Sequence, residues 1–597
     1  MAGDPKAGQD WLDQRTGYKA LLHEALFENV PGGARWRYVW GSTLTFFFAV
    51  QVITGLFLWM SYSPSSQTAW ESVYFIQHQM WGGWFLRGLH HFVAQTMTVL
   101  LVLHLMQVII DGAYKAPREV NYWFGVGLLL LVLALSLTGY LLPWDQNGYW
   151  ATAVSTNIVG MSPGIGQAAQ TVVVGGASYG HHTLTRFFAL HAGLIPGLII
   201  VLIIGHVYLF RRHGLTPKQP LKGPDEGFWP EQVLRDAVAC LAVLAVVIFF
   251  VVREHGAPLG APADPAEQFS AARPEWYFLF LYQLLKYFPG KTEIIGAIIL
   301  PTLVMIVLVA IPILGKWRLG HRFNVGFVGV MLAGVALLSW QAVSADKKDP
   351  DYQVAKQIAA RDAARAVELA DNGVPITGAL TLVRNDAYTQ GPRIFSRNCA
   401  SCHRYDGHDG LGNALPKDSI SASDLKGFGS RAWVKGFLDV DTIMTRRYWG
   451  GTVHTEGDMV GWLNDHIPET DAQVEARHNV VLALSSQAQL KTQAALDVQD
   501  SAKIAAGIAF MRNTKGGCAE CHVFQDVGTD SPELTGWGSR QWMIDFVNDP
   551  AHKRFFGRDN DRMPSYGVEK SLTPREIEMV VDWIRGDWYT PKAKAGK

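Results

Sequence analysis

Seven apolar segments between residues 37 and 343 constrain the fold of this chain more than any other feature. An α-helix needs about 20 mostly apolar residues to cross the hydrocarbon core of a bilayer. Segments of that length lie near residues 37–60, 84–110, 121–141, 185–210, 234–253, 292–314 and 324–343. The sequence therefore predicts an all-α fold with a seven-span transmembrane helical bundle. The short aromatic stretch 276–288 follows Pro274, and we expect a re-entrant or interfacial helix there.

Lys and Arg orient these spans, because positively charged loops stay on the cytoplasmic side of a membrane. The loops 61–86 and 143–185 contain neither residue type, whereas the N-terminal stretch and the loops after the second, fourth and sixth spans do. We therefore expect a multi-pass protein of the bacterial inner membrane with a cytoplasmic N-terminus. An odd number of spans then places the polar C-terminal part in the periplasm. The positive residues are Lys6, Arg15, Lys19, Arg35, Arg37, Lys115, Arg118, Arg211, Arg212, Lys218, Lys222, Lys316, Arg318 and Arg322.

Two further observations bear on this topology. The loop 254–291 carries Arg273, Lys286 and Lys291, but the count of spans places it on the outer side. The first ten residues have no apolar core, so we expect no cleavable signal peptide.

Four histidines lie within two of the apolar segments. His90 and His104 are 14 residues apart, and His191 and His206 are 15 residues apart. Both spacings are close to a whole number of helical turns, so each helix presents two imidazoles on nearly one face. Polar groups are costly inside a membrane, which makes these residues functional candidates. Two such helices side by side can clamp two flat macrocycles, as in a cytochrome with two b haems.

Both of these helices cross the membrane from outside to inside. We therefore expect His90 and His191 to bind the iron of an outer haem, and His104 and His206 to bind the iron of an inner haem. His91 points elsewhere on its helix and is not an expected ligand.

Glycines repeat the spacing of the histidines on two other spans. Gly41 and Gly55 are 14 residues apart on the first span, and Gly125 and Gly139 are 14 apart on the third. A glycine lets a flat ring approach the backbone, so we expect each haem to rest against two of them. The alternative is ordinary packing of small residues between helices. Arg87 and Arg186 precede the outer histidines and suit the propionates of the outer haem.

Four of the five cysteines stand in two Cys-x-x-Cys-His motifs. In this signature the thiols bond the haem vinyl groups and the histidine binds iron. Two copies count against the alternatives of a redox disulfide or a zinc site, so we predict two covalent c haems. Cys240 is alone in an apolar run, and we expect it to be inert packing. The two motifs comprise Cys399, Cys402 and His403, then Cys518, Cys521 and His522.

The two motifs belong to an internal repeat. Each is followed by a Leu-x-Gly-x-Gly-Ser-Arg-x-Trp stretch, at 425–433 and 534–542, and each copy ends in a predicted helix, near 474–488 and 573–586. A c haem usually takes a distal methionine, and alignment of the copies indicates one for each. The distal candidates are Met459, with His454 and Met444 as rivals, and Met563. We expect two tandem cytochrome c-like helical domains.

The predicted boundaries follow from these features. Residues 1–36 form a cytoplasmic amphipathic segment with one helix over 10–30. Residues 346–371 are charged and alanine-rich, and we expect a solvated helix leading away from the membrane. The remaining parts are a four-helix dihaem core (37–230), the later helices with their loop (231–344), a charged linker (345–385) and the two c-type domains (386–492 and 493–597).

Four motifs give residues 37–343 a family resemblance. They are Arg87-Gly88-Leu89-His90, Gly139-Tyr140-Leu141-Leu142-Pro143-Trp144, Thr185-Arg186-Phe187-Phe188 and Pro274-Glu275-Trp276-Tyr277. These motifs resemble the cytochrome b of quinol:cytochrome c oxidoreductases, the cytochrome bc1/b6f family. The seven spans resemble its photosynthetic branch, in which a cytochrome b6-like and a subunit IV-like chain are separate; here they are fused.

The chain departs from this family at two places. The photosynthetic branch carries an extra haem on a cysteine before the first-span glycine, where this chain has Val39 and Trp40. Gln107 stands where an arginine often follows the inner haem ligand, so the partners of the inner propionates are open.

The resemblance also implies two quinone sites. Oxidation of a quinol releases two protons, so a carboxylate at a membrane-edge pocket is a suitable acceptor. Glu275 is that candidate at the outer face, and the alternative is a helix-capping glutamate beside Pro274. Three tyrosines are expected to line or gate the outer pocket, Tyr140, Tyr277 and Tyr282. The resemblance makes two further residues candidates at the inner site, Arg211 and Asp236.

The sequence thus predicts a cytochrome b–c fusion in a respiratory quinol:cytochrome c oxidoreductase. Quinol would be oxidised outside, with one electron crossing the b haems to an inner quinone and one reaching the c haems through a separate Rieske iron–sulfur protein, with proton translocation. The expected acceptor is a cytochrome c or a terminal oxidase, and the resemblance implies a homodimer. A net charge of zero gives no reason to expect a nucleic-acid partner.

Two alternatives remain open from the sequence. One is a quinone-linked membrane anchor that relays electrons to a periplasmic partner without bifurcation. The other is a haem-based redox sensor. The Pro-Glu-Trp-Tyr loop favours the quinol:cytochrome c oxidoreductase over the anchor, which has no need of it. Seven spans with four paired ligands, plus two distal methionines, suit electron flow better than signalling.

Overall fold

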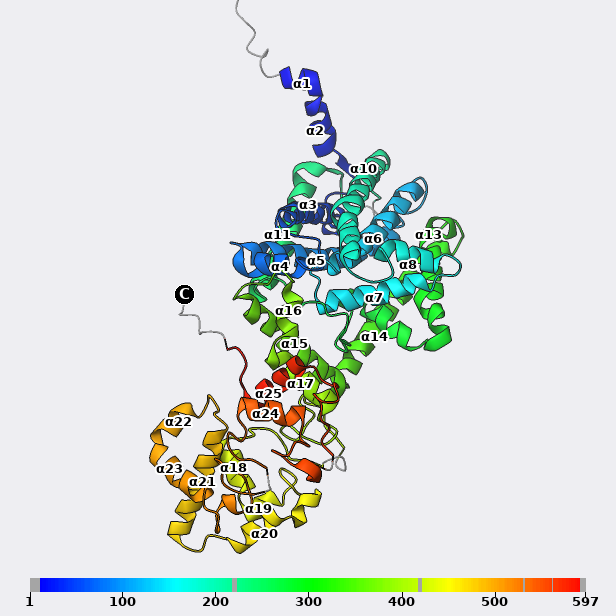
Figure 1. The fold of residues 1–597 in the computed structure, drawn as a ribbon. Helices are drawn as coiled ribbons and strands as arrows, with labels where there is room; N and C mark the ends of the chain where they lie inside the picture. The colour runs from blue at the N-terminus through cyan, green and yellow to red at the C-terminus, as the bar shows by residue number, and fades with distance from the viewer. Residues whose placement is uncertain (1–10, 217–222, 417–420, 530–531, 561, 591–597) are drawn as a thin grey trace, which may run out of the picture. The chain divides into compact units, whose positions relative to one another are not determined.

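The computed structural model describes residues 11–216, 223–416, 421–529, 532–560 and 562–590 (Figure 1). Residues 1–10 of the predicted N-terminal segment, including Lys6, lie outside this range, as do Lys218 and Lys222. The chain splits into two compact units: Met1–Gln353 with Ile376–Ala379, and Val354–Pro375 with Leu380–Lys597. Within the described residues the fold is helical apart from one antiparallel pair of two-residue strands, β1 (Asn29–Val30) and β2 (Glu226–Gly227).

The first unit contains the seven predicted spans. Among the residues that the structure describes, seven helical stretches are long and apolar enough to cross a membrane: Trp40–Trp59, Gly83–Ile110, Glu119–Tyr140, His181–His213, Phe228–Arg253, Gly290–Leu314 and Gly320–Lys348. Their main helices are α3 (Trp40–Trp59), α5 (Gly83–Ile110), α6 (Glu119–Tyr140), α9 (His181–Ala189), α10 (Ile195–His213), α11 (Val233–Arg253), α13 (Leu300–Leu314) and α14 (Gly320–Lys348).

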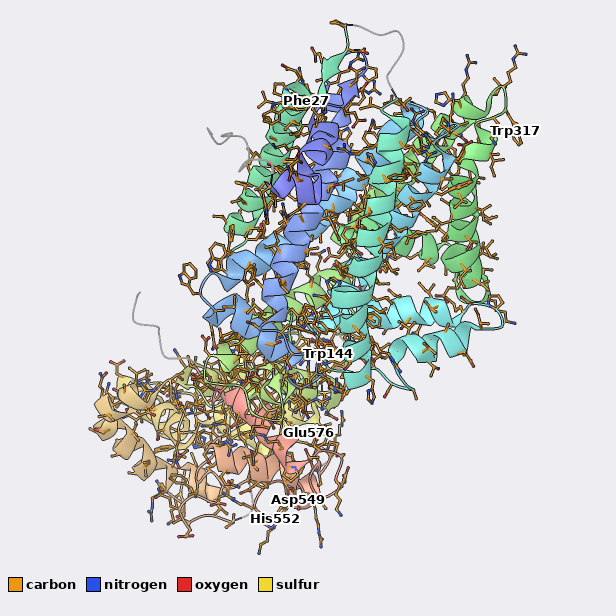
Figure 2. The ribbon with its side chains drawn as sticks, turned by 90° about the horizontal axis from the view of Figure 1, so that it is seen from above. Phe27, Trp144, Trp317, Asp549, His552 and Glu576 are labelled. Atoms are coloured by element: carbon orange, nitrogen blue, oxygen red, sulfur yellow. The ribbon has the colours of Figure 1, made fainter. Side chains whose placement is uncertain are left out.

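Shorter helices lie in the connections, namely α4 (Ala69–Tyr74), α7 (Gln146–Gly160), α8 (Gly166–Val174) and α12 (Leu279–Lys286). Helix α12 falls within the stretch 276–288, where a short helix was expected. A buried core joins α3, α5, α6, α10 and α11 through Phe47, Val93, Val132, Ile199 and Val247. In Figure 2, Phe27 and Trp317 lie at one end of this bundle and Trp144 at the other, as the charge pattern requires of inner and outer loops.

The N-terminal segment differs from the single helix predicted over 10–30. It forms α1 (Trp11–Thr16) and α2 (Tyr18–Leu26), separated by Gly17. Gly17 has a φ of +63°, a left-handed conformation that glycine adopts without steric cost and that ends a helix. Trp11, Leu22 and Phe27 of the predicted apolar side are exposed, whereas Leu26 is half-buried.

The second unit begins within α15 (Pro350–Ala370), and the expectation of a solvated helix there is wrong. Asp362 and Arg365 are buried at 3% and 4% exposure. Arg393 donates to Asp362 at 2.6 Å, and Arg365 donates to Asp386 at 2.7 and 3.1 Å. Asp362 and Arg365 of α15 are therefore paired inside the second unit rather than solvated, which a sequence pattern of mixed charge does not reveal.

The other helices of the second unit are α16 (Ala379–Arg384), which begins in the last residue of the first unit, α17 (Ala387–Asn398), α18 (Arg431–Phe437), α19 (Val440–Ile443), α20 (Asp458–Asp465), α21 (Asp471–Gln487), α22 (Ala494–Gln499), α23 (Ser501–Met511), α24 (Arg540–Asn548) and α25 (Pro574–Arg585). Thr573 caps the start of α25, and its side chain accepts from the Glu576 N–H in a capping box.

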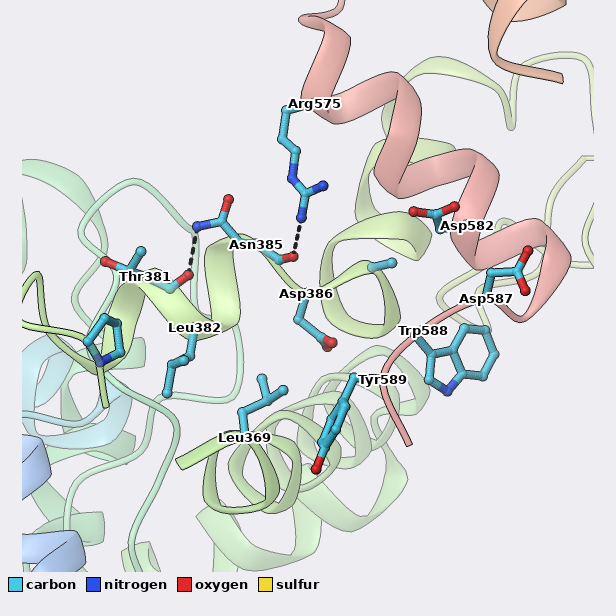
Figure 3. Close-up of a pocket in the computed structure, with 12 residues that line it drawn as sticks. Leu369, Thr381, Leu382, Asn385, Asp386, Arg575, Asp582, Asp587, Trp588 and Tyr589 are labelled. Atoms are coloured by element: carbon cyan, nitrogen blue, oxygen red, sulfur yellow. Dashed lines mark hydrogen bonds between the residues drawn. The ribbon is translucent and has the colours of Figure 1, made fainter. Parts of the chain in front are cut away.

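The two sequence repeats are intertwined, which corrects the expectation of tandem domains at 386–492 and 493–597. Helix α17 of the first repeat packs against α25 of the second, and α21 of the first packs against α23 of the second. Figure 1 shows α25 in red beside α17. In Figure 3, Arg575 of α25 donates to the Asn385 carbonyl, just before α17, at 2.9 Å.

Glycines allow both of these helix pairs to approach closely. A Cβ on Gly391 of α17 would collide with Trp583 of α25. A Cβ on Gly507 of α23 would lie 2.7 Å from the Cβ of Ala483 in α21. The repeat therefore uses the same device twice, each time between opposite halves of the sequence.

Candidate functional site

The four histidines of the bundle form two facing pairs. The ring centroids of His90 and His191 are 6.2 Å apart, and those of His104 and His206 are 6.5 Å apart. With a metal–nitrogen bond of about 2 Å on each side, two imidazoles that share one metal have centroids about 6 Å apart. Each pair therefore has the separation of two imidazoles that would hold one metal ion between them. The pairing is the one that the spacing predicted.

Contacts at Nδ1 orient three of these rings. His191 Nδ1 lies 3.1 Å from the Leu135 carbonyl, and His206 Nδ1 lies 3.0 Å from the Asn121 carbonyl. His90 Nδ1 lies 2.8 Å from Thr54 Oγ1. A carbonyl partner requires Nδ1 to carry the proton, so the Nε2 lone pair is free for a metal.

A π-helical turn explains the unequal spacing of the histidines. Leu190–Leu194, which joins α9 to α10, has π-helical hydrogen bonding and contains His191. A π-turn inserts one residue into an α-helix. The extra residue keeps His191 in line with His206 at a spacing of 15, while α5 achieves the same alignment at 14 without an insertion.

Each of the four predicted glycines lies against one histidine. A Cβ on Gly139 would lie 2.5 Å from Cε1 of His191, and one on Gly55 would lie 3.3 Å from Cε1 of His90. The same construction gives 3.3 Å between Gly125 and His206, and 3.7 Å between Gly41 and His104. The glycines thus make room for the imidazoles themselves. The imidazoles can occupy these positions because glycine has no side chain.

The two arginines near the outer pair have different surroundings. Arg87 donates to the carbonyls of Ala257 and Pro258 at 2.7 and 2.6 Å, and to Gln77 at 2.9 Å. It therefore ties α5 to the loop after α11. Arg186 is exposed and open to an anionic group. His91 contacts Gln95 at 2.8 Å, away from the facing pairs, as expected.

The structure gathers an acidic cluster at the end of α6 that follows Gly139. Tyr140, at the end of α6, has Glu275, Asp145 and Tyr277 as electrostatic neighbours. Burial raises the pKa of the Glu275 carboxyl, the Asp145 charge raises it further, and the Trp276 N–H opposes both. Burial also raises the pKa of Tyr277, and Glu275 adds to this effect. A carboxyl with a raised pKa beside two tyrosines is suited to accept a proton from a bound hydroxyl group.

Asp145 is a member of this cluster that the sequence analysis missed. Its carboxylate accepts from the N–H groups of Gly148 and Gly260 at 2.8 and 2.9 Å, and it is 7% exposed. Burial raises its pKa, while these two N–H groups and Arg87 oppose the increase. The sequence indicates only its local role, since an Asp just before a helix is a typical N-cap.

The ring contacts of Tyr282 are with basic side chains and not with Glu275. Its ring is covered by Arg273 at 4.9 Å and by Lys286 at 4.4 Å. Arg273 in turn forms a bidentate pair with Asp346, both distances being 2.9 Å. The expected role of Tyr282 beside the quinol is therefore not supported by a contact with the acidic cluster.

The two candidates for the inner site have separate partners. Asp236 accepts from Ser42 and from Gln232, both at 2.7 Å, and is 7% exposed. Ser42 follows Gly41, so Asp236 lies near the His104 pair. Arg211 lies 3.9 Å from Glu28. Asp236 is thus part of a polar cluster with Ser42 and Gln232, whereas Arg211 is exposed and lies beside Glu28.

The comparisons with known proteins agree with this arrangement. Residues 95–266 match the family described as cytochrome b(N-terminal)/b6/petB, and residues 262–360 match cytochrome b(C-terminal)/b6/petD. Cytochrome b of Cereibacter sphaeroides is 33% identical over 308 residues, which are 49% of this chain and 69% of that one.

The chain belongs to the cytochrome b family.

Two further relatives add detail. The menaquinol:cytochrome c reductase cytochrome b subunit of Geobacillus thermodenitrificans is 36% identical over 215 residues, 35% of this chain and 96% of that one. A protein named cytochrome b/c1, from Bradyrhizobium diazoefficiens, is 33% identical over 291 residues, 47% of this chain and 42% of that one. The chain is a cytochrome b subunit of a quinol:cytochrome c reductase complex, and this family implies two b haems.

Beyond the cytochrome b part, the two Cys-x-x-Cys-His motifs have the same local geometry. The His403 N–H donates to the Cys399 carbonyl and the His522 N–H to the Cys518 carbonyl, both at 2.8 Å, so each motif forms a single turn. His403 Nδ1 lies 2.8 Å from the Ser423 carbonyl, and His522 Nδ1 lies 3.0 Å from the Pro532 carbonyl. Burial lowers the pKa of both imidazoles, and the neutral form is the one that binds iron.

Proposed function

We propose that this chain is a cytochrome b–c fusion that oxidises quinol at the outer face of a bacterial inner membrane. The observation that carries the proposal is the cluster of Glu275, Tyr140, Asp145 and Tyr277 in the same unit as two facing histidine pairs. A buried carboxyl with a raised pKa is a proton acceptor matched to a quinol hydroxyl near neutral pH. The haems, when bound, supply one-electron transfer.

The residues that would hold the haems follow from the geometry. His90 with His191, and His104 with His206, would bind the two b haem irons, and Gly41, Gly55, Gly125 and Gly139 would shape the space around them. Cys399, Cys402, Cys518 and Cys521 would bond two c haems, with His403 and His522 on the irons. Arg87 and Arg186 would face the outer propionates, and Arg186 is the freer of the two in the described chain.

The inner site would reduce a quinone with Asp236 as the proton donor or relay. Its two hydrogen bonds, from Ser42 and Gln232, hold the carboxylate at the end of the bundle that contains His104. Arg211 would attract the anionic form of the quinone head group. A separate Rieske protein would take the other electron, and a cytochrome c or a terminal oxidase would be the acceptor of the c haems, in a homodimeric complex.

Replacement of Glu275 tests the outer site. We expect Glu275→Gln to slow quinol oxidation by at least about 100-fold, because the amide cannot accept the proton. The haem content and the b haem spectra should remain unchanged. Glu254→Gln, at an exposed glutamate of the same loop, is the matched control and should retain full activity. Loss of b haem in the Glu275 variant would instead show a structural role.

Purification of the complex tests bifurcation. We expect a Rieske iron–sulfur signal in the EPR spectrum of the purified complex, and quinol oxidation should be blocked by an inhibitor of the Rieske-side pocket. A fully active complex without that signal would favour the non-bifurcating anchor.

A further inference from the structure

We propose that the two repeats of the C-terminal unit exchange their distal haem ligands. The haem on Cys399 and Cys402 takes Met563, from the second repeat. The haem on Cys518 and Cys521 takes Met459, from the first. The inference rests on the proposed function, in which both motifs hold haem, and it reverses the pairing that sequence alignment of the repeats implies.

The first line of support is the composition of the core around Cys518. Cys518 and Met459 pack against the same buried cluster, which includes Trp433, Val460 and Phe524. This cluster combines residues from both repeats: Val460 of α20, the helix that contains Met459, and Val480 of α21 belong to the first, and Met511 of α23 belongs to the second. Arg477 of α21 is also an electrostatic neighbour of the Cys518 thiol. The second motif and Met459 thus pack on the same core.

The second line of support is a contact next to Cys399. Tyr566 donates its hydroxyl to the carbonyl of Asn398 at 2.5 Å, and its ring is 8% exposed in the cluster against which Cys399 packs. Cys399 and Cys402 are electrostatic neighbours of Tyr566. Met563 precedes Tyr566 by three residues, and the side chain of Asn560 donates to its carbonyl at 2.9 Å. The loop that contains Met563 is therefore held beside the first motif by the hydrogen bond of Tyr566.

The chain passes from one pocket to the other at the repeated glycine stretch. Phe428 and Trp537 occupy equal positions in the two stretches, and their rings contact each other with centroids 4.9 Å apart. Both side chains pack on both core clusters. The flanking glycines all have left-handed φ values that favour glycine: Gly427 (+72°), Gly429 (+78°), Gly536 (+66°) and Gly538 (+71°).

This crossing explains how two copies of one sequence can exchange halves. Before the stretch, each repeat supplies the helix and the Cys-x-x-Cys-His turn of one pocket. After it, each repeat supplies the methionine loop and the final helix of the other pocket. The local signals in the two copies are the same in either arrangement, so the partner is decided only by tertiary packing.

Variants that retain one c haem test the assignment in the full-length chain. With Cys518→Ser and Cys521→Ser, only the first haem is attached. In that background we expect Met563→Ala to abolish the methionine-to-ferric-iron charge-transfer band and to lower the midpoint potential, because methionine ligation raises it. Met459→Ala is the matched control and should leave both readouts unchanged.

The reciprocal background, with Cys399→Ser and Cys402→Ser, should reverse these results. Loss of the band through Met459→Ala in the first background would overturn the exchange while leaving the presence of c haem established. Absence of covalent haem from the unmodified chain would instead refute the proposed function.

A milder variant covers the case in which Met563→Ala fails to mature. Tyr566→Phe keeps the ring and removes only the hydrogen bond to Asn398. We expect it to shift the midpoint potential or the pH of ligand loss for the first haem and to leave the second unchanged. An effect confined to the second haem would contradict the proposal.

Discussion

At the scale of single residues, the outer acidic cluster shows how burial and charge set the chemistry of one carboxyl. Glu275 loses solvent, and the neighbouring Asp145 charge adds to the cost of ionising it, so its pKa lies above the ordinary value. A base must be deprotonated to accept a proton. We therefore expect the rate of quinol oxidation to fall as the pH drops through the raised pKa of Glu275.

Asp145→Asn tests this electrostatic link. Removal of the Asp145 charge lowers the pKa of Glu275, so the acid limb of the pH–rate profile should move to lower pH. The variant also weakens one of two backbone hydrogen bonds, with a cost of about 1 kcal/mol in stability. Steady-state rates measured from about pH 5 to about pH 9, a range around physiological pH, show the shift.

A matched variant separates charge from packing. Asp264 is another buried carboxylate of the same region, and it accepts from the Ala266 N–H at 3.0 Å. Asp264→Asn should leave the acid limb in place. A shift of the limb in this variant, or none in Asp145→Asn, would contradict the assignment of Asp145.

At the scale of helices, the b-haem part depends on small residues at helix crossings. A Cβ on Gly139 of α6 would lie 2.5 Å from the ring of His191, closer than real side chains approach. Gly127, on the same helix, has only the end of the Leu202 side chain at 3.3 Å. The two glycines are twelve residues apart in sequence. Gly139 faces an imidazole ring, whereas Gly127 faces the flexible end of a leucine side chain.

We expect Gly139→Ala to displace His191 and to lower the occupancy of the outer b haem site. Gly127→Ala should leave both b haem sites fully occupied. Overpacking of a rigid site costs about 1–3 kcal/mol, which is enough to lower haem occupancy several-fold. The ratio of outer to inner b haem in a redox titration of the purified chain measures the effect. Equal b haem content in the two variants would show that α6 can shift to accommodate the new methyl group.

At the scale of the whole chain, sequence patterns predicted what is local and missed what is tertiary. Hydropathy located the seven spans, and the spacing of the histidines on each helix, with the common direction of the two helices, paired His90 with His191 and His104 with His206. The burial of Arg365 against Asp386 and the position of Asp145 beside Glu275 depend on segments distant in sequence. The exchange of the repeats is the clearest case, because both copies have the same pattern whichever partner they contact.

Deletion of the second repeat distinguishes an exchanged unit from two tandem domains. A chain that ends at residue 492 would keep one c haem if residues 386–492 folded alone. In the exchanged unit, α17 loses α25 and α21 loses α23, including the buried Val581 and Trp583. Each such core side chain is worth about 2–5 kcal/mol, so their joint loss exceeds the 5–15 kcal/mol that typically stabilises a domain.

We therefore expect the c haem of the shortened chain to fall to near zero, not to half, while both b haems remain. Haem c and haem b can be measured separately by extraction, since only haem b is non-covalent. A flexible insertion after Lys491, an exposed residue in the connection between α21 and α22, is the control: it lengthens the link but retains both helix pairs, and it should keep both c haems. Half of the c haem in the shortened chain would show that the first repeat folds by itself.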